Sequence, residues 1–122
     1  MSHVWVDVEI ADIEKRKSVT AKALVDTGAS LMVVPKKLAD ELGLEASSEE
    51  KVITGAGIVT LKRAQLWIRL QGKEEPFSAW ISEQIDKVLI GVVVLKSLGF
   101  EVDPTTETLR EKPLLLYAYC SA

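Results

Sequence analysis

Asp26 is the residue whose position and neighbours best suit a chemical role. It opens the segment Asp26-Thr27-Gly28-Ala29-Ser30 and follows directly on the apolar residues Ala23-Leu24-Val25. An Asp-Thr-Gly triplet alone is typical of a turn, because Asp tolerates tight backbone geometry and Gly supplies positive φ. Here a buried strand before the triplet would hold the carboxylate close to the body of the fold, whereas a loop tip would leave it far out in solvent. The small residues after it leave the backbone free to approach a ligand.

Two further segments that contain glycine are relevant to the same site. Leu89-Ile90-Gly91 repeats the pattern of two apolar residues and a glycine far downstream. Gly55-Ala56-Gly57 lies between two arms rich in β-branched residues, which predicts a glycine-tipped hairpin. A phosphate-binding loop is set aside for these glycines, since the Lys, the Ser/Thr and the helix of a P-loop are missing.

Together these segments resemble the retropepsin-like aspartic protease family. Its pattern is an apolar pair, Asp-Thr/Ser-Gly-Ala/Ser, a flap hairpin, and then two apolar residues and Gly leading into a helix. The resemblance extends over about residues 24–99, which is most of the chain. Residues 34–39 and 89–104 are more similar to the stand-alone prokaryotic members than to the viral ones.

The resemblance implies a role for each residue of the first segment. Asp26 would be the catalytic carboxylate, and Thr27 would hydrogen-bond across a dimer axis to fix two active-site loops against each other. Gly28 would let the backbone approach the carboxylate and the substrate, and Ala29 would support the loop beside it.

The resemblance also assigns the two other segments. Gly55-Ala56-Gly57 would be the tip of a flap that closes over a bound peptide, and Leu89-Ile90-Gly91 would pack against the Asp26 loop. Two features depart from the family pattern. Viral members often place an arginine after the downstream glycine, where this chain has Val92, and a flap aromatic of the pepsin type is absent.

A homodimer follows from the chemistry independently of the family. Aspartic-protease catalysis needs two carboxylates, one as base and one as acid, and this chain has a single Asp-Thr-Gly and no room for a second lobe. A two-fold axis beside Asp26 would supply the second carboxylate from an identical chain. The sequence thus predicts an aspartic endopeptidase that hydrolyses peptide or protein substrates without a metal or organic cofactor.

Two other interpretations remain open at this point. The first is a retropepsin-fold dimer that binds peptides or protein partners without cleaving them. The second is a monomeric structural module in which Asp26 only caps a turn.

The elements that must position these residues are mostly strands. Val4, Val6, Val8 and Ile10 alternate with polar or aromatic residues, the period of a strand with one buried face. Pro35 and Gly43 bracket one short helix and Gly99 ends another, whereas the polar residues 45–51 predict a loop. The expected fold is mainly β, a small closed barrel-like acid-protease fold with two short helices. The predicted strands and helices are residues 4–10, 18–25, 36–42, 52–54, 58–60, 64–70, 77–81, 88–91, 92–98, 100–102 and 108–109. The last two of these segments are expected to form a final hairpin, and residues 31–34 are an apolar run.

Length and composition narrow the function further. The 122 residues fit a single domain, residues 1–122, and the formal charge of −3 argues against a nucleic-acid partner. The sequence shows no signal peptide and no apolar stretch long enough to span a bilayer, so we expect a cytoplasmic protein without a membrane partner. The lone Cys120 cannot form an internal disulfide and is expected to be an inert thiol, and His3 to be solvated.

Apolar residues outside the expected core suggest contacts of another kind. Trp5, Trp67 and Trp80 fall on the strand faces opposite the aliphatic rows. They could line a substrate groove, although a second packed face or a subunit contact is the preferred interpretation. The segment Leu114–Tyr119 could be a buried edge strand or a strand that meets its mate in a dimer.

Overall fold

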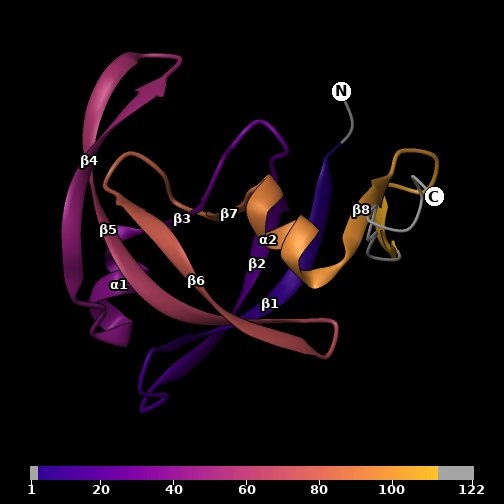
Figure 1. The fold of residues 1–122 in the computed structure, drawn as a ribbon, viewed down its shortest axis with the longest axis horizontal. Helices are drawn as coiled ribbons and strands as arrows, with labels where there is room; N and C mark the ends of the chain where they lie inside the picture. The colour runs from indigo at the N-terminus through magenta and orange to yellow at the C-terminus, as the bar shows by residue number, and fades with distance from the viewer. Residues whose placement is uncertain (1–2, 113–122) are drawn as a thin grey trace, which may run out of the picture.

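The computed structural model describes residues 3–112 (Figure 1). Cys120 and the apolar segment 114–119 therefore lie outside the described residues. The elements in chain order are β1 (Val4–Asp12), β2 (Ser18–Val25), β3 (Met32–Pro35), α1 (Lys36–Leu42), β4 (Ala46–Thr54), β5 (Gly57–Leu70), β6 (Lys73–Ser82), β7 (Val88–Ile90), α2 (Val92–Leu98), β8 (Phe100–Asp103) and β9 (Thr108–Glu111).

Most strands form one sheet that closes on itself. Its order is β1-β2-β7-β3-β6-β5-β4, and β1 also pairs with β5, so all strands of this sheet except β4 form a closed ring. The closing pairs join Glu9–Asp12 to Leu66–Arg69 in antiparallel register. The predicted fold class, a mainly β closed barrel with two short helices, is confirmed.

The core fills the inside of this ring because the strand period places every second side chain there. On β5, Ala64, Leu66, Ile68 and Leu70 are fully buried, while the alternating residues between them are exposed or half-buried. Ile10, Met32, Val34 and Ile90 bring fully buried side chains from the other strands. Burial of each large aliphatic side chain contributes about 1.5–3 kcal/mol, so the barrel holds most of the stability of the fold.

Both helices begin and end where the sequence predicts. Pro35 is the N-cap of α1, and Gly43 ends it in the left-handed conformation at φ 66°. Gly91 and Gly99 flank α2 in the same way, with Gly99 at φ 78°. Glycine adopts these angles without the Cβ clash that other residues meet. Neither helix in the described part of the chain has the length and apolar character that crossing a membrane requires.

The prediction of a loop at residues 45–51 is wrong. Residues from Ala46 to Thr54 form β4, which pairs with β5 from Ala46↔Ala64 to Thr54↔Gly57. The two strands predicted at 58–60 and 64–70 are likewise one continuous strand, β5. β4 is polar because it lies at the sheet edge outside the closed ring, so its side chains remain largely in solvent.

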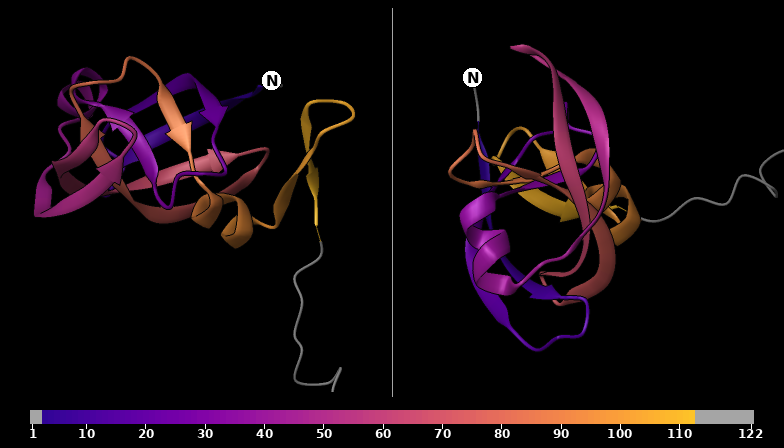
Figure 2. Two further views of the ribbon diagram at one scale, coloured as in Figure 1. Left: turned by 90° about the horizontal axis from the view of Figure 1, so that it is seen from above. Right: turned by 90° about the vertical axis from the view of Figure 1, so that its left-hand side faces the viewer.

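The β4–β5 hairpin and the β8–β9 hairpin extend from opposite sides of the barrel (Figures 1 and 2). β8 and β9 form a separate two-stranded sheet, which confirms the predicted final hairpin. Lys73 at the β5–β6 turn attaches this hairpin to the barrel: its Nζ donates to the Leu98 carbonyl at 2.9 Å and lies 4.9 Å from the centre of the Phe100 ring.

Candidate active site

Asp26 stands at the end of β2, where the parallel ladder with β7 stops. Val25 pairs with Ile90, and the Asp26 backbone N–H donates to the Ile90 carbonyl at 2.9 Å. The backbone of Asp26 is thus an extension of a strand that lies in the barrel wall. The prediction that a strand leads into Asp26 is confirmed, but of the residues Ala23-Leu24-Val25 only Ala23 is buried, and the other two are half-buried.

The Asp26 carboxylate is held by its own loop. The Gly28 N–H donates to Asp26 Oδ1 at 3.0 Å, and the Ala29 N–H donates to the Asp26 carbonyl at 3.1 Å. A Cβ at position 28 would lie 3.2 Å from Oδ1, so a side chain there would crowd the carboxylate. Within residues 3–112 the carboxylate makes no other hydrogen bond, which leaves Oδ2 free to act on a reactant.

Gly91 and the first residues of α2 brace this loop from behind. A Cβ at Gly91 would lie 2.6 Å from the Ala29 carbonyl oxygen and 2.7 Å from that of Leu31, so only glycine fits. The Val92 N–H donates to the Ala29 carbonyl at 3.0 Å, and the Val93 N–H to that of Ser30 at 3.4 Å. The structure thus packs Leu89-Ile90-Gly91 against the Asp26 loop, as the sequence predicts.

The other predicted loop residues lie at or near the surface. Thr27 and Gly28 are exposed, while Asp26 and Ala29 are half-buried. Trp5 and Val93 are also exposed, at 49% and 43%, on segments next to the loop: Trp5 pairs with Leu24 of β2, and Val93 bonds to Ser30.

The tip of the β4–β5 hairpin is the turn from Thr54 to Gly57. The Thr54 hydroxyl accepts the Ala56 N–H at 3.1 Å and donates to the Gly57 carbonyl at 2.9 Å. Gly57, at φ 110°, is the tip residue that needs the freedom of glycine. The cross-strand neighbours Ile53 and Ile58 are exposed at 85% and 69%, which is unusual for large aliphatic side chains.

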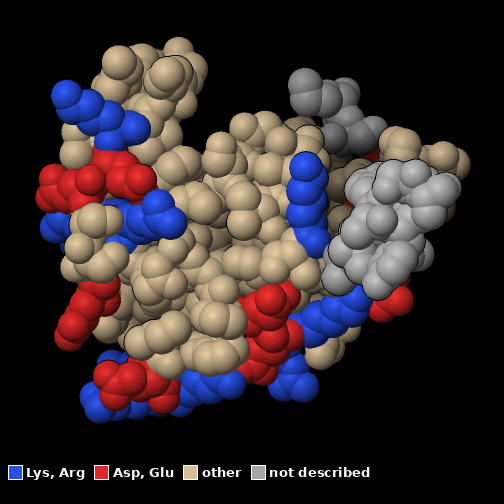
Figure 3. Space-filling model, viewed as in Figure 1, with Lys and Arg blue, Asp and Glu red and all other residues tan. Residues whose placement is uncertain are grey.

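The structure does not bring this tip into contact with Asp26. The hairpin and the loop after β2 rise on the same side of the barrel (Figure 1), and the surface is hollowed between the hairpin and the rest of the molecule (Figure 3). Among the described residues no hydrogen bond joins the tip to the Asp26 loop.

A carboxylate at the root of the β4–β5 hairpin was missed by the sequence analysis. Glu50 Oε1 accepts hydrogen bonds from Arg63 Nη1 and Trp80 Nε1, both at 3.0 Å. Bonding to the Trp80 indole and to Arg63 holds the pKa of Glu50 below its ordinary value. The glycine tip and the length of β5 were the signals that could have predicted a β4 arm long enough to include Glu50.

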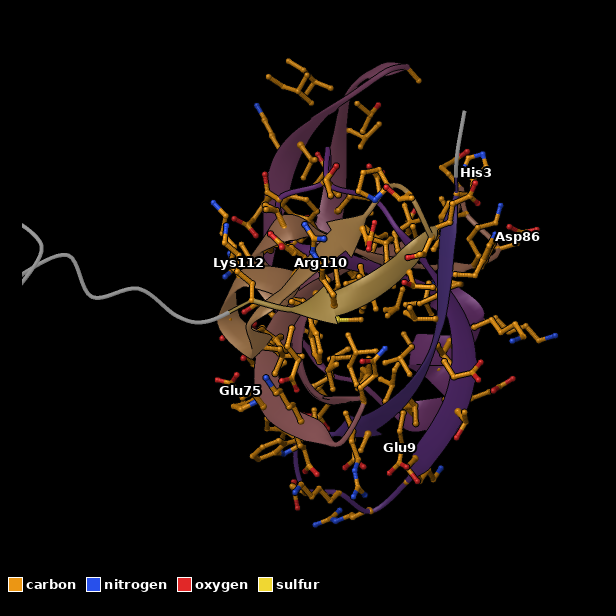
Figure 4. The ribbon with its side chains drawn as sticks, turned by 90° about the vertical axis from the view of Figure 1, so that its right-hand side faces the viewer. His3, Glu9, Glu75, Asp86, Arg110 and Lys112 are labelled. Atoms are coloured by element: carbon orange, nitrogen blue, oxygen red, sulfur yellow. The ribbon has the colours of Figure 1, made fainter. Side chains whose placement is uncertain are left out.

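The remaining candidate features lie elsewhere or are absent. A recess of about 160 Å³ is lined by Glu9, Lys15, Trp67 and Glu74 at the end of β1 opposite His3 (Figure 4), far from Asp26 at the other end of β2. Trp67 belongs to this end, where its indole N–H donates to the Ile13 carbonyl at 2.8 Å. In residues 3–112 no three His, Cys, Asp or Glu side chains are grouped to hold a metal ion.

Comparisons with known proteins give one matching family. The family model described as "gag-polyprotein putative aspartyl protease" matches residues 11–97. No curated protein sequence matches the chain.

Several solved structures share the fold. The EIAV protease in complex with the inhibitor HBY-793 is 17% identical, with a TM-score of 0.64 over 93% of each chain. A retropepsin-like aspartic protease from Rickettsia conorii is 24% identical, with a TM-score of 0.59 over 83% of this chain and 76% of that one. The protease of simian foamy virus is 20% identical, with a TM-score of 0.52 over 71% of this chain and 86% of that one.

Proposed function

Since this chain belongs to the gag-polyprotein aspartyl protease family, we propose that it is an aspartic endopeptidase whose site combines Asp26 of two identical chains. The observation that carries the proposal is the Asp26 loop, in which the Gly28 N–H fixes one carboxylate oxygen at 3.0 Å and no group of the described residues bonds to the other. Glycine is the residue that fits behind the loop, at position 91.

The surface around the loop supports a homodimer. Thr27 is exposed at its turn, and the exposed apolar side chains of Trp5 and Val93 flank it. Large apolar side chains in solvent favour association, and a two-fold axis here would bring the two Asp26 carboxylates together. Thr27 is proposed to bond across that axis, with Gly28 and Ala29 supporting the loop.

The mechanism follows from the repulsion between two close carboxylates. At about 3 Å two full negative charges repel by about 5 kcal/mol at an effective dielectric constant near 20, so the pair retains one proton over a wide pH range. The ionised carboxylate accepts a proton from a water molecule, whose oxygen attacks the scissile carbonyl. The protonated carboxylate donates to the carbonyl oxygen, which gives a tetrahedral intermediate. The C–N bond of this intermediate then breaks as the proton taken from water passes to the leaving amine.

The β4–β5 hairpin is proposed to be the lid of this site, with Gly55-Ala56-Gly57 at its tip. The tip is apolar and exposed, and the hairpin rises on the same side of the barrel as the loop after β2 (Figure 1). Closure over a peptide would bury Ile53 and Ile58 and exclude water from the reacting carbonyl. The substrates are therefore proposed to be peptides or proteins.

The extent of the domain and its cellular location are proposed from the sequence alone. We propose that residues 1–122 form one protease domain and that it works in the cytoplasm. The single cysteine supports that location, because a fold without disulfides does not depend on an oxidising compartment.

The substitution Asp26→Asn tests the catalytic assignment. It keeps the shape of the side chain and removes its ionisable group, so hydrolysis of a peptide substrate should fall to background while the fold persists. Asp40→Asn on the exposed face of α1 is the control and should keep the parent rate. Hydrolysis by the Asp26 variant at the parent rate would show that the chemistry lies elsewhere.

The same assay separates catalysis from peptide binding. The parent protein should show a bell-shaped rate profile on the acid side of neutrality, since one carboxylate must be ionised and the other protonated. Tight binding of a statine-type inhibitor without any hydrolysis would instead favour a dimer that binds peptides and does not cleave them. A rate that needs added metal would contradict the paired-carboxylate mechanism.

A further inference from the structure

The outer part of the β4–β5 hairpin has no support from the rest of the sheet. β6 pairs with β5 only from Lys62 onward, so residues 57–61 of β5 pair with β4 alone. A two-stranded hairpin is marginally stable in water without further contacts. We call this part of the hairpin, residues 51–60, the outer arm. Its orientation therefore depends on the contacts at the level of the sheet where β6 begins to pair with β5.

Glu50 lies at the level where β6 joins the sheet. It pairs with Leu61, the last residue of β5 before β6 joins the sheet. Its carboxylate reaches across β5 to Trp80 of β6, and it also bonds to Arg63, which stands directly opposite Trp80. Among the described residues Glu50 is the β4 residue whose side chain is hydrogen-bonded beyond β5, so it ties together all three strands.

The hydrogen bond between Glu50 and Arg63 is charge-assisted. Arg63 is charged and Glu50 is ionised near neutrality, and charge-assisted hydrogen bonds are shorter and stronger than neutral ones. The Glu50 and Arg63 side chains are 36% and 34% exposed, so water screens the pair only in part. An isolated surface ion pair would be weak, but the shared bond to the indole N–H fixes the geometry of the carboxylate.

We propose that Glu50 is a positioning residue that clamps the root of the β4–β5 hairpin through Arg63 and Trp80 and thereby holds the outer arm in the orientation needed to close over Asp26. The inference rests on the proposed function for the role of the hairpin as a lid. The clamp itself is a property of the fold and can be measured without hydrolysis.

The clamp responds to pH in a defined direction. The Trp80 indole and Arg63 lower the pKa of Glu50 from its ordinary value of 4.5, and Arg63 is the one charged group that contributes to this shift. A carboxylate with a lowered pKa stabilises the folded state above its unfolded pKa, and this contribution is lost as pH falls through the folded pKa. The clamp is thus complete above the ordinary pKa of 4.5 and is released as the pH falls through the lowered pKa of Glu50.

Hydrogen exchange of the outer arm tests the clamp directly. In Glu50→Ala, amides of residues 51–60 should exchange about tenfold faster at neutral pH, whereas those of β1 should not change. Glu49→Ala is the matched control, because Glu49 is exposed and makes no side-chain hydrogen bond or ion pair within residues 3–112. Equal exchange in the two variants, or an equal increase in β1, would overturn the proposal.

A double-mutant cycle with Trp80→Phe shows whether the two residues act together. Phe keeps an aromatic ring and removes the indole N–H, so this variant should also accelerate exchange of residues 51–60. The double variant Glu50→Ala/Trp80→Phe should then exchange little faster than Glu50→Ala alone. Fully additive effects would mean that the bond between them does not carry the clamp.

Kinetics then relate the clamp to the lid. The KM of Glu50→Ala for a peptide substrate should rise about tenfold with a smaller change in kcat, because binding must now also order the arm. Glu49→Ala should keep both constants. An absence of hydrolysis in the parent protein would count against the proposed function, whereas the exchange result decides on the clamp independently.

Discussion

Gly91 determines how closely α2 can approach the loop that carries Asp26. Its missing side chain leaves room for the carbonyl oxygens of Ala29 and Leu31, which would lie 2.6 Å and 2.7 Å from a Cβ. Those two contacts are to backbone atoms, which cannot move aside as the end of a flexible side chain can. The position of the Asp26 loop is therefore coupled to one residue 65 places after Asp26 in the chain, by the difference of their numbers.

We expect Gly91→Ala to destabilise the fold by about 2 kcal/mol, because overpacking against rigid backbone costs about 1–3 kcal/mol. For a domain of this size that corresponds to a fall in Tm of about 10 °C. Gly55→Ala is the control: its Cβ would have no atom within 4 Å, so Tm should hardly change. Thermal unfolding of the two variants side by side makes the comparison, and an unchanged Tm for Gly91→Ala would mean that the loop and α2 move apart easily.

Among the elements, those with a strong local signal could be predicted from the sequence. Alternating valines predicted β1, and the glycines at positions 43 and 99 predicted the ends of both helices. β4 could not be predicted in this way, because residues 45–51 are polar on both faces and their strand conformation depends on pairing with β5. The Glu50 contacts were missed for the same reason, since they join three strands that are separate in sequence.

The candidate site also has features that could be predicted from the sequence and features that could not. The Asp26 loop and its contact with Gly91 could be predicted because each carries a short motif with a glycine. The sequence also located the tip of the β4–β5 hairpin, yet it did not show that Gly57, rather than Gly55, adopts the positive φ. Backbone angles at a turn depend on the register of its two arms, which only the paired strands define.

The tip of the β4–β5 hairpin should therefore respond differently to the same change at two neighbouring positions. Gly57 is at φ 110°, where a β-branched residue is strained, while Gly55 has a negative φ and open space around it. Gly57→Val should lower kcat/KM by at least about tenfold, which corresponds to about 1.4 kcal/mol. The Tm should change little, because the tip lies outside the barrel core.

Gly55→Val is the matched comparison for this prediction and should lower kcat/KM clearly less than Gly57→Val, because Gly55 does not have a positive φ. Steady-state kinetics and thermal unfolding of both variants provide the measurements. A fully active Gly57→Val, or one that unfolds outright, would show that the hairpin is a structural element and that the lid lies elsewhere.

At the scale of the whole molecule, the barrel is complete but the proposed site is not. The ring of strands closes within one chain and buries its core, so the fold needs no strand from a second copy. The proposed chemistry, however, needs a second carboxylate beside Asp26, and the exposed Thr27, Trp5 and Val93 form the surface on which we propose that another copy docks. Folding and activity should therefore depend differently on protein concentration.

Dilution should separate these two properties. Below the dissociation constant of the dimer, the concentration of active sites falls as the square of the total protein, so specific activity should decline on dilution while circular dichroism per molecule stays constant. A ninefold excess of Asp26→Asn chains should reduce the activity of a fixed amount of parent protein to about one tenth, because random pairing leaves few parent dimers. The same excess of an unrelated protein is the control. Activity strictly proportional to concentration through a range in which light scattering finds only monomers, together with no inhibition by the Asp26→Asn chains, would mean that one chain holds a complete site.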